Sequence, residues 1–277
     1  MNSVLLAEDK ARLGIVLPAL DPDRFRYTVA DFANPALVMA GFDCIVPFQL
    51  KDHYDLWARS DFDQLNCLIP PVGLMQLLDN KYDCNRFLAA RGFGALVPPM
   101  LDGADSATAW PVIYKKRQDA FGNHSFLCHS PEELDAFEAA TVRTEYFTQE
   151  YVPGAVEYAT HMLSVAGRVL YHSTFRYTFD TAFYVKGRRY EPPLPEACAC
   201  PCPAPLVAIL AEFEYTGTCC FNYKVSGYKM PGCNIARDCG TNEPKIFEIN
   251  PRFGHSLAYD INNYLDAYID ALRAGRR

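Results

Sequence analysis

Residues 245–254, with the sequence KIFEINPRFG, constrain the fold of this chain more than any other segment. Successive side chains of a β-strand point to opposite faces, so Glu248, Asn250 and Arg252 are expected on one face. The apolar side chains of the segment are expected on the other face, in the core: Phe247, Ile249 and Phe253. Carboxylate and amide oxygens are magnesium ligands and arginine binds phosphate, so the polar face predicts a site for a metal–nucleotide complex. The alternative is a solvated strand face.

The run that precedes this segment, residues 218–225, repeats the pattern. Asn222 and Lys224 share one face, while aromatic side chains alternate with them on the other. If the two runs pair as an antiparallel hairpin, Asn222 approaches Glu248 and Asn250 and completes an oxygen-rich cluster.

The rest of the chain predicts a mixture of helices and strands. A small amino-terminal α/β unit is expected from strands at 4–6 and 44–48 and a helix at 11–20. The later elements are a helix at 77–92, strands at 111–114 and 126–128, a helix at 130–140, an extended segment at 146–152, a hairpin of 158–165 with 169–177, a helix at 206–215, strands at 218–225 and 245–250, and a final helix at 257–272.

Four motifs in this order resemble the ATP-grasp superfamily. The late strand EINPRFGHS lies at 248–256, a helix with an acid and a lysine, DNKYDCNRFLAARG, at 79–92, the strand PVIYKK at 111–116, and the hinge-like TQEYVPGAVEY at 148–158. The resemblance covers roughly residues 65–265. It implies an α/β (α+β) protein with the ATP-grasp fold and a shortened amino-terminal pre-ATP-grasp α/β domain.

The resemblance also implies a division of the chain into three parts. Residues 1–75 are expected to form the pre-ATP-grasp domain, 76–147 the small lid subdomain and 148–277 the large carboxyl-terminal subdomain. ATP is expected between the last two.

The resemblance implies a nucleotide site with ATP and Mg2+ as cofactors, and the family's site residues can be carried over to matching positions of this sequence. Lys115 is expected to contact the phosphate and adenine side, with Lys81 in support, and Glu157 to accept hydrogen bonds from the ribose. The adenine is expected along the hinge residues Gln149, Glu150, Tyr151 and Val152.

The remaining assignments concern the metal and the reaction. Asn222, Glu248 and Asn250 are expected to hold magnesium. The catalytic candidates are Arg252, which faces the transferred phosphoryl group or the acyl phosphate, and Arg176, on a strand where relatives place a phosphate-contacting cation.

The activity implied is ATP-dependent ligation of a small carboxylic acid to an amine through an acyl phosphate, with an amino acid or a sugar acid as examples of the acid. Two alternatives stay open: a small-molecule kinase of the same fold, and a nucleotide-binding regulatory protein without turnover. The second is motivated by Asn222, which stands where relatives carry an acid or glutamine, and by a loop with Gly122 as its one glycine. His255 replaces a residue that is often glycine and is expected near the substrate.

Composition excludes several other classes. A formal net charge of −7 disfavours nucleic acid as a partner. No apolar run approaches the roughly 20 residues of a membrane span, and no export signal is recognised, so a cytoplasmic protein is expected. The eleven cysteines are expected to be reduced. Cys198, Cys200 and Cys202 are spaced more closely than zinc ligands usually are, which favours a loop. Neither the substrates nor the oligomeric state can be derived from the sequence.

Overall fold

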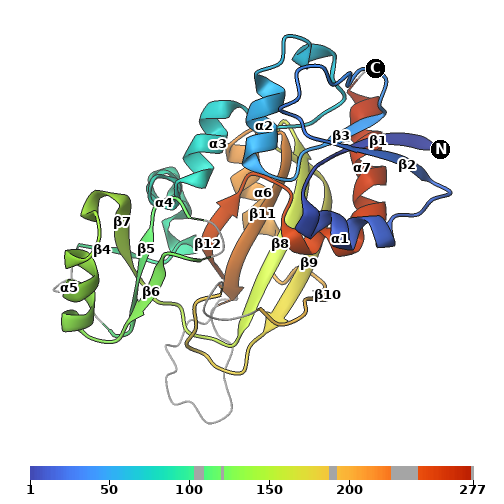
Figure 1. Cartoon of the computed structure of the whole chain (residues 1–277). Coiled ribbons are helices and arrows are strands. Elements are labelled where there is room, and N and C mark those ends of the chain that lie inside the picture. Colours follow the sequence, from blue (N-terminus) through green and yellow to red (C-terminus); the bar gives the residue numbers. More distant parts are fainter. Residues whose placement is uncertain (103–108, 120–121, 187–191, 226–242, 276–277) are drawn as a thin grey trace.

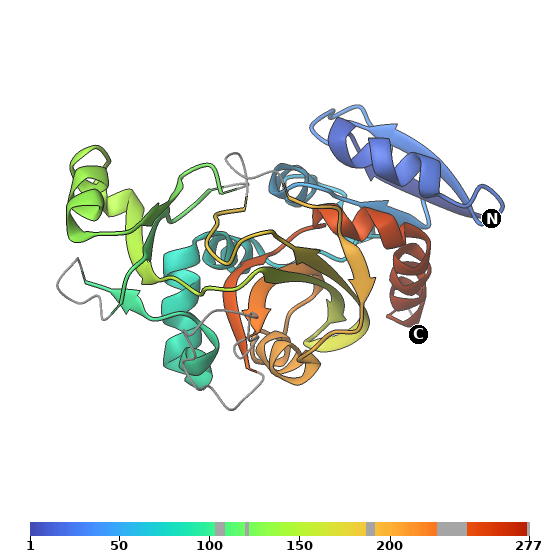
Figure 2. The same cartoon turned by 90° about the horizontal axis from the view of Figure 1, so that it is seen from below.

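The computed structural model describes residues 1–102, 109–119, 122–186, 192–225 and 243–275. Its strands form three sheets that lie in a row, with the four-stranded sheet at one end, the five-stranded sheet in the middle and a three-stranded sheet at the other end (Figures 1 and 2).

The three-stranded sheet is parallel and belongs to the amino-terminal part. It has the order β2-β1-β3 and is built from β1 (Asn2–Ala7), β2 (Phe25–Ala30) and β3 (Cys44–Val46). Helices α1 (Lys10–Ala19) and α2 (Leu50–Trp57) and a 3-10 turn, η1 (Phe62–Gln64), connect and follow these strands. The middle of β1 is fully buried, as expected for a parallel strand covered on both faces.

The last helix of the chain, α7 (Ile261–Ala274), packs against β3 and α1 (Figure 2). The hydroxyl of its buried Tyr268 donates to the carbonyl of Ile45 at 3.3 Å. This contact ties the two ends of the described chain into one hydrophobic core. A 3-10 segment, η6 (His255–Asp260), precedes α7, so the regular helix begins later than predicted.

The four-stranded sheet is antiparallel and has the order β4-β7-β5-β6. Its strands are β4 (Met100–Leu101), β5 (Val112–Lys116), β6 (Ser125–Cys128) and β7 (Tyr146–Glu150), and a 3-10 turn, η5 (Arg143–Glu145), leads into β7. Helix α5 (Pro131–Ala139) begins as predicted, because Ser130 accepts a hydrogen bond from the amide of Glu133 and a proline occupies the first turn. Residues 120–121 of the expected loop before β6 lie outside the described residues.

The five-stranded sheet is antiparallel, with the order β10-β9-β8-β11-β12. It consists of β8 (Val156–Val165), β9 (Arg168–Thr178), β10 (Glu196–Cys198), β11 (Gly217–Val225) and β12 (Pro244–Asn250). Ala166 and Gly167 join β8 to β9 with φ of 48° and 78°, the two-residue hairpin expected from the sequence. Helix α6 (Pro203–Glu212) buries Leu206 and Ile209 against one face of the sheet.

The predicted helix at 77–92 is interrupted. The structure has α3 (Val72–Asp79), α4 (Lys81–Leu88), a π-helical turn η2 (Ala89–Phe93) and a 3-10 turn η3 (Gly94–Leu96). Asn80 breaks the helix with ψ of 97°, and its side chain caps α4 by accepting from the amide of Asp83. Asparagine is among the favoured N-cap residues, so the sequence contained a signal for a helix start at Asn80. The helical spacing of apolar residues on both sides of Asn80 favoured one continuous helix instead. The break at Asn80 makes Lys81 the start of a new helix.

No helix among the described residues has the length and apolar character needed to span a membrane.

Candidate active site

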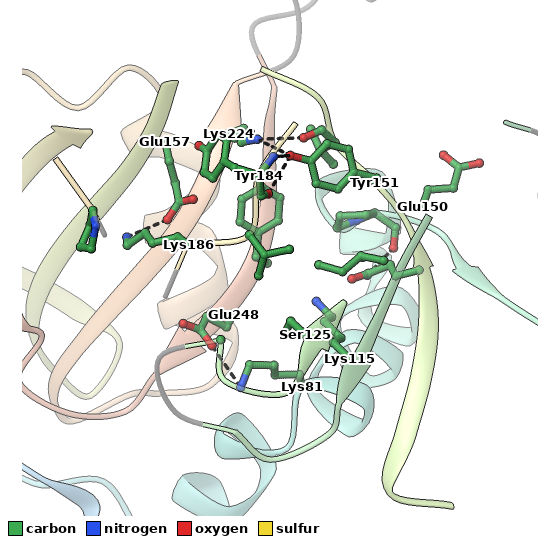
Figure 3. Close-up of a pocket in the computed structure, with 18 residues that line it drawn as sticks. Lys81, Lys115, Ser125, Glu150, Tyr151, Glu157, Tyr184, Lys186, Lys224 and Glu248 are labelled. Carbon is green, nitrogen blue, oxygen red and sulfur yellow. Dashed lines mark hydrogen bonds and ion pairs between the residues drawn. The ribbon is translucent and has the colours of Figure 1, made fainter. Parts of the chain in front are cut away.

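A pocket of about 300 Å³ lies where the four-stranded and five-stranded sheets face each other (Figure 3). This volume is at the lower end of the range for small-molecule sites. Its lining includes eight of the predicted site residues: Lys81, Lys115, Gln149, Glu150, Tyr151, Val152, Glu157 and Glu248. Elements far apart in the sequence therefore contribute to one cavity.

Glu248 is the centre of a polar cluster at one end of this pocket. Its Oε1 atom accepts hydrogen bonds from the side-chain amides of Asn222 at 2.8 Å and Asn250 at 2.9 Å. Its Oε2 atom lies 3.2 Å from Nζ of Lys81, which also donates to the carbonyl of Asp119. Burial alone would raise the pKa of Glu248, but Lys81 and the two amides lower it to about 2. The carboxylate is therefore ionised at neutral pH.

The predicted hairpin explains how these side chains meet. β11 and β12 pair antiparallel, with Asn222 directly opposite Glu248. A bulge follows this pair, since Tyr223 is opposite Ile246 and Phe247 is left between them. Ile246 enters the core, and Phe247 lines the pocket. The prediction that Phe247 faces the core was wrong, because the bulge shifts the alternation by one residue; Ile249 and Phe253 are buried as predicted.

The donor chemistry of the cluster fits magnesium. The described residues contain no group of three or more His, Cys, Asp or Glu side chains placed to hold a metal. Mg2+, however, is commonly bound through one or two carboxylates together with substrate phosphates and water. Glu248 supplies the carboxylate, and rotation of the amides of Asn222 and Asn250 by a half turn presents their oxygens to a cation.

Lys115 lies on β5 at the floor of the pocket and is 5% exposed. Its Nζ atom is 5.1 Å from the centre of the Phe147 ring. Burial, with the neighbouring positive charge of Lys81, lowers the pKa of Lys115 to about 7. A lysine of this kind is stabilised in its charged form by any anion that enters the pocket.

The segment after β7 is held from both sides. The side chain of Gln149 donates to the carbonyl of Pro98 at 2.7 Å, and the amide of Glu150 donates to the carbonyl of Pro99 at 2.9 Å. The hydroxyl of Tyr151 accepts from the amide of Tyr184 and donates to its carbonyl, both at 2.8 Å. The backbone beside the pocket is thereby fixed in position.

Two further lysines, Lys186 and Lys224, line the pocket, and no role was predicted for them (Figure 3). Lys186 donates to Glu157 at 2.7 Å. Burial alone would lower the pKa of Lys186, but the Glu157 carboxylate raises it. Lys224 donates to the carbonyl of Val152 at 3.0 Å, and burial lowers its pKa to about 8. Lys224 was detectable from its alternation with Asn222, whereas Lys186 follows β9 in an irregular segment without periodicity.

Comparison with solved structures gives the fold of this arrangement. The chain matches D-alanine–D-alanine ligase from Bacillus anthracis over 100% of its own length and 98% of that chain, with 10% identity and a TM-score of 0.61. It matches biotin carboxylase from Campylobacter jejuni over 98% and 70% of the two chains, with 16% identity and a TM-score of 0.64. The match to D-cycloserine synthetase DcsG covers 98% and 99%, with 13% identity and a TM-score of 0.58.

The chain has the ATP-grasp fold. No protein-family model and no curated protein sequence matches it. At these sequence identities the likeness concerns the fold, which confirms the fold class expected from the four motifs.

One predicted residue of the ATP-grasp site lies elsewhere. Arg176 pairs across the sheet with Tyr158, on the face opposite to Glu157, and its exposed side chain forms an ion pair with Glu196 of β10. Strand alternation turns it away from the pocket. Its position does not fit the expected phosphate contact, and the assignment is corrected accordingly.

Arg252 is linked to the pocket through Asn250, which donates to the pocket residue Glu248. Its guanidinium donates to Oδ1 of Asn250 at 3.1 Å, and its positive charge helps to lower the pKa of Glu248. The ion pairs found among the described residues do not include Arg252, so its charge is open to a ligand.

The cysteine segment expected as a loop is partly ordered as a strand. Cys198 ends β10, which pairs with β9, and Cys202 precedes α6. The described cysteines are free thiols, as the composition predicted.

Proposed function

We propose that this chain is an ATP-dependent ligase that joins a small carboxylic acid to an amine through an acyl phosphate and releases ADP and phosphate. The observation that carries the proposal is the cluster around Glu248. It lies at the end of a pocket whose other residues suit a nucleotide, and next to Arg252, which forms no ion pair with a carboxylate of the described residues. Several structural neighbours are named as ligases or synthetases, among them an L-amino acid ligase from Bacillus licheniformis.

In this proposal ATP lies between the four-stranded and five-stranded sheets. The backbone of Glu150 to Val152 borders the adenine, and Glu157, oriented by Lys186, accepts from the ribose hydroxyls. Lys115 and Lys81 neutralise the phosphates. D-alanine–D-alanine ligase from Bacillus anthracis has been solved in complex with ATP. In this proposal the chain divides into an amino-terminal domain (1–75), a small lid subdomain (76–147) and a large carboxyl-terminal subdomain (148–277).

Glu248, Asn222 and Asn250 are the residues that would hold magnesium. When bound there, the cation neutralises charge on the triphosphate. Before a cation binds, the two amides keep the carboxylate oriented, since both donate to the same oxygen.

The first step of the proposed reaction is attack of a carboxylate oxygen on the γ-phosphorus, with the β–γ bridging oxygen leaving on ADP. The cationic side chains of Lys81, Lys115 and Arg252 stabilise the negative charge that spreads over the transferred group. The amine nitrogen then attacks the acyl carbon and expels phosphate. Arg252 donates to the oxyanion of the tetrahedral intermediate, and the nitrogen loses its proton to complete the amide.

The experiment that tests this function is a mass-spectrometric search for ATP-dependent condensation products in mixtures of acids and amines, together with an assay of ADP release. We expect an amide product with loss of water relative to its two precursors, and ADP in equal amount. In Glu248→Ala we expect ADP release to fall at least a hundredfold, because the carboxylate contacts the metal and not the core. Full activity in that variant, or a stable phosphorylated acid formed without any amine, would count against the ligase.

A further inference from the structure

Arg12 is a buried arginine of the amino-terminal part that lies beside the proposed reaction site. It is in the first turn of α1, and its side chain is 6% exposed. It forms an ion pair with Asp9, the N-cap residue of the same helix, but its Nε atom has no hydrogen-bond partner among the described residues. A buried donor without a partner lowers the stability of the folded protein, so an acceptor that binds at this atom would be favoured.

The helix that carries Arg12 packs directly on the segment that follows Arg252. α1 contacts η6, which begins at His255, three residues after Arg252. Burial lowers the pKa of Arg12, and the nearby charge of Arg252 lowers it further. The two guanidinium groups are therefore close enough to repel each other across the junction between α1 and the turn after β12.

The two carboxylates near this junction already accept hydrogen bonds from other groups. Asp9 accepts from the amide of Arg12, from its guanidinium and from the side chain of Gln49. Asp52 accepts through one oxygen from the amides of Phe48 and Gln49. The Nε atom of Arg12 is a donor that these groups leave without an acceptor among the described residues.

We propose that Arg12 binds a carboxylate that the ligation does not consume, so that one of the two substrates carries a carboxylate in addition to the one that is activated. This inference rests on the proposed function and deepens it. A carboxylate supplies the acceptor that Nε of Arg12 lacks among the described residues, and its planar shape matches the fork geometry of a guanidinium. The assignment makes Arg12 a specificity residue contributed by the amino-terminal part.

The additional carboxylate has two possible sources. It belongs either to a dicarboxylic acid that is activated at its other end or to an amine substrate that is itself an amino acid. Matched pairs of substrates that differ only in this group separate the two: succinate against succinamate as the acid, and L-alanine against L-alaninamide as the amine, within wider panels built in the same way.

The experiment measures kcat/KM from ADP release for each pair, in the wild type and in Arg12→Met. We expect the wild type to prefer the carboxylate member in one of the two arms. In Arg12→Met we expect kcat/KM for that member to fall about tenfold to a hundredfold, with the amide analogue unchanged, because only the charged hydrogen bond is lost. Arg12→Lys should restore part of the preference.

Two controls separate specificity from folding. Arg59→Met removes another largely buried arginine of the amino-terminal part, one that pairs with Asp61, and should leave the preference intact. The Arg12→Met variant leaves the buried carboxylate of Asp9 without its positively charged partner. The double variant Asp9→Asn/Arg12→Met removes that unpaired charge, and it should lose the substrate preference as Arg12→Met does.

The outcomes are distinct. ADP release with equal kcat/KM for both members of every pair, or a preference that survives in Arg12→Met, overturns the inference and leaves the ligase standing. Absence of ADP release with every acid and amine overturns the proposed function, and the inference with it.

Discussion

Lys115 is deeply buried and lines the pocket, and its low pKa has a consequence for the proposed binding of ATP. Lys81 and Cys84 of α4, Glu248 of β12 and the Phe147 ring of β7 surround it. With a pKa of about 7, a large part of Lys115 is neutral at pH 8. Phosphate oxygens favour the charged form, so its pKa rises when ATP binds and a proton is taken up.

We therefore expect ATP affinity to be greatest below pH 7 and to fall by up to tenfold per pH unit above it. Calorimetry at pH 8 in two buffers of different ionisation enthalpy measures the proton uptake directly. Lys115→Met serves as the control, because it should bind ATP more weakly and without that uptake. An identical heat of binding in both buffers for the wild type would contradict the prediction.

Single residues also mark the limit of the sequence analysis. Glu248, Asn250 and Asn222 could be grouped from strand alternation alone, because all three lie on two adjacent strands. Lys186 and Arg12 could not. Each reaches its place through long-range packing of an irregular segment or of a separate sheet, which leaves no periodic trace in the sequence.

At the scale of elements, Lys224 joins β11 to the segment that leads from β7 to β8. Its Nζ atom donates to the carbonyl of Val152 and lies 4.2 Å from the centre of the Tyr184 ring. The Lys224→Met substitution keeps the side-chain volume but removes the hydrogen bond to Val152. We therefore expect ATP affinity to fall about tenfold, with a small change in melting temperature. Calorimetry measures the affinity.

The matched control for this link is Lys245→Met. Lys245 lies opposite Lys224 on β12 but donates to the carbonyl of Ala95, and the pocket lining does not include it. Its replacement should leave ATP binding unchanged. Equal affinity in the wild type and Lys224→Met would show that the backbone at Val152 holds its position without the lysine.

The elements that sequence patterns predicted well are those with local signals. The hairpin of β8 and β9 has its turn in Ala166-Gly167, and α5 has its cap in Ser130. Two of the errors arose where one residue changes a pattern that is otherwise regular: Asn80 divides a helix, and the bulge at Phe247 moves an aromatic side chain from the core to the pocket. Register and helix breaks depend on tertiary partners that a single sequence does not display.

At the scale of the whole molecule, two buried histidines predict how stability depends on pH. Burial lowers the pKa of His53 to about 4 and that of His161 to about 3, whereas both return to about 6.5 on unfolding. The unfolded chain thus binds more protons between pH 4 and 6.5, and stability falls as the pH falls through that window. Glu248 does not contribute to this loss above pH 4.5, since its pKa is lowered on folding.

From these pKa values we expect the free energy of unfolding to drop by about 2 kcal/mol per histidine between pH 7 and pH 5. Urea denaturation at several pH values measures it. In His53→Gln, which can still donate to the carbonyl of Gln49, the slope should be about half that of the wild type. A slope that is the same in both proteins would rule out His53 as a source.

The ion pair between Lys81 and Glu248 joins α4 to β12 across the boundary of the two facing sheets. A divalent cation that approaches alone must compete with the ammonium group for the same oxygen. If it arrives with a triphosphate, Lys81 gains a new anionic partner as it gives up the old one. If the proposed site binds both, the metal and nucleotide affinities are thermodynamically coupled, each strengthened by the other by the same factor, and free metal binds more weakly than metal that arrives with a triphosphate.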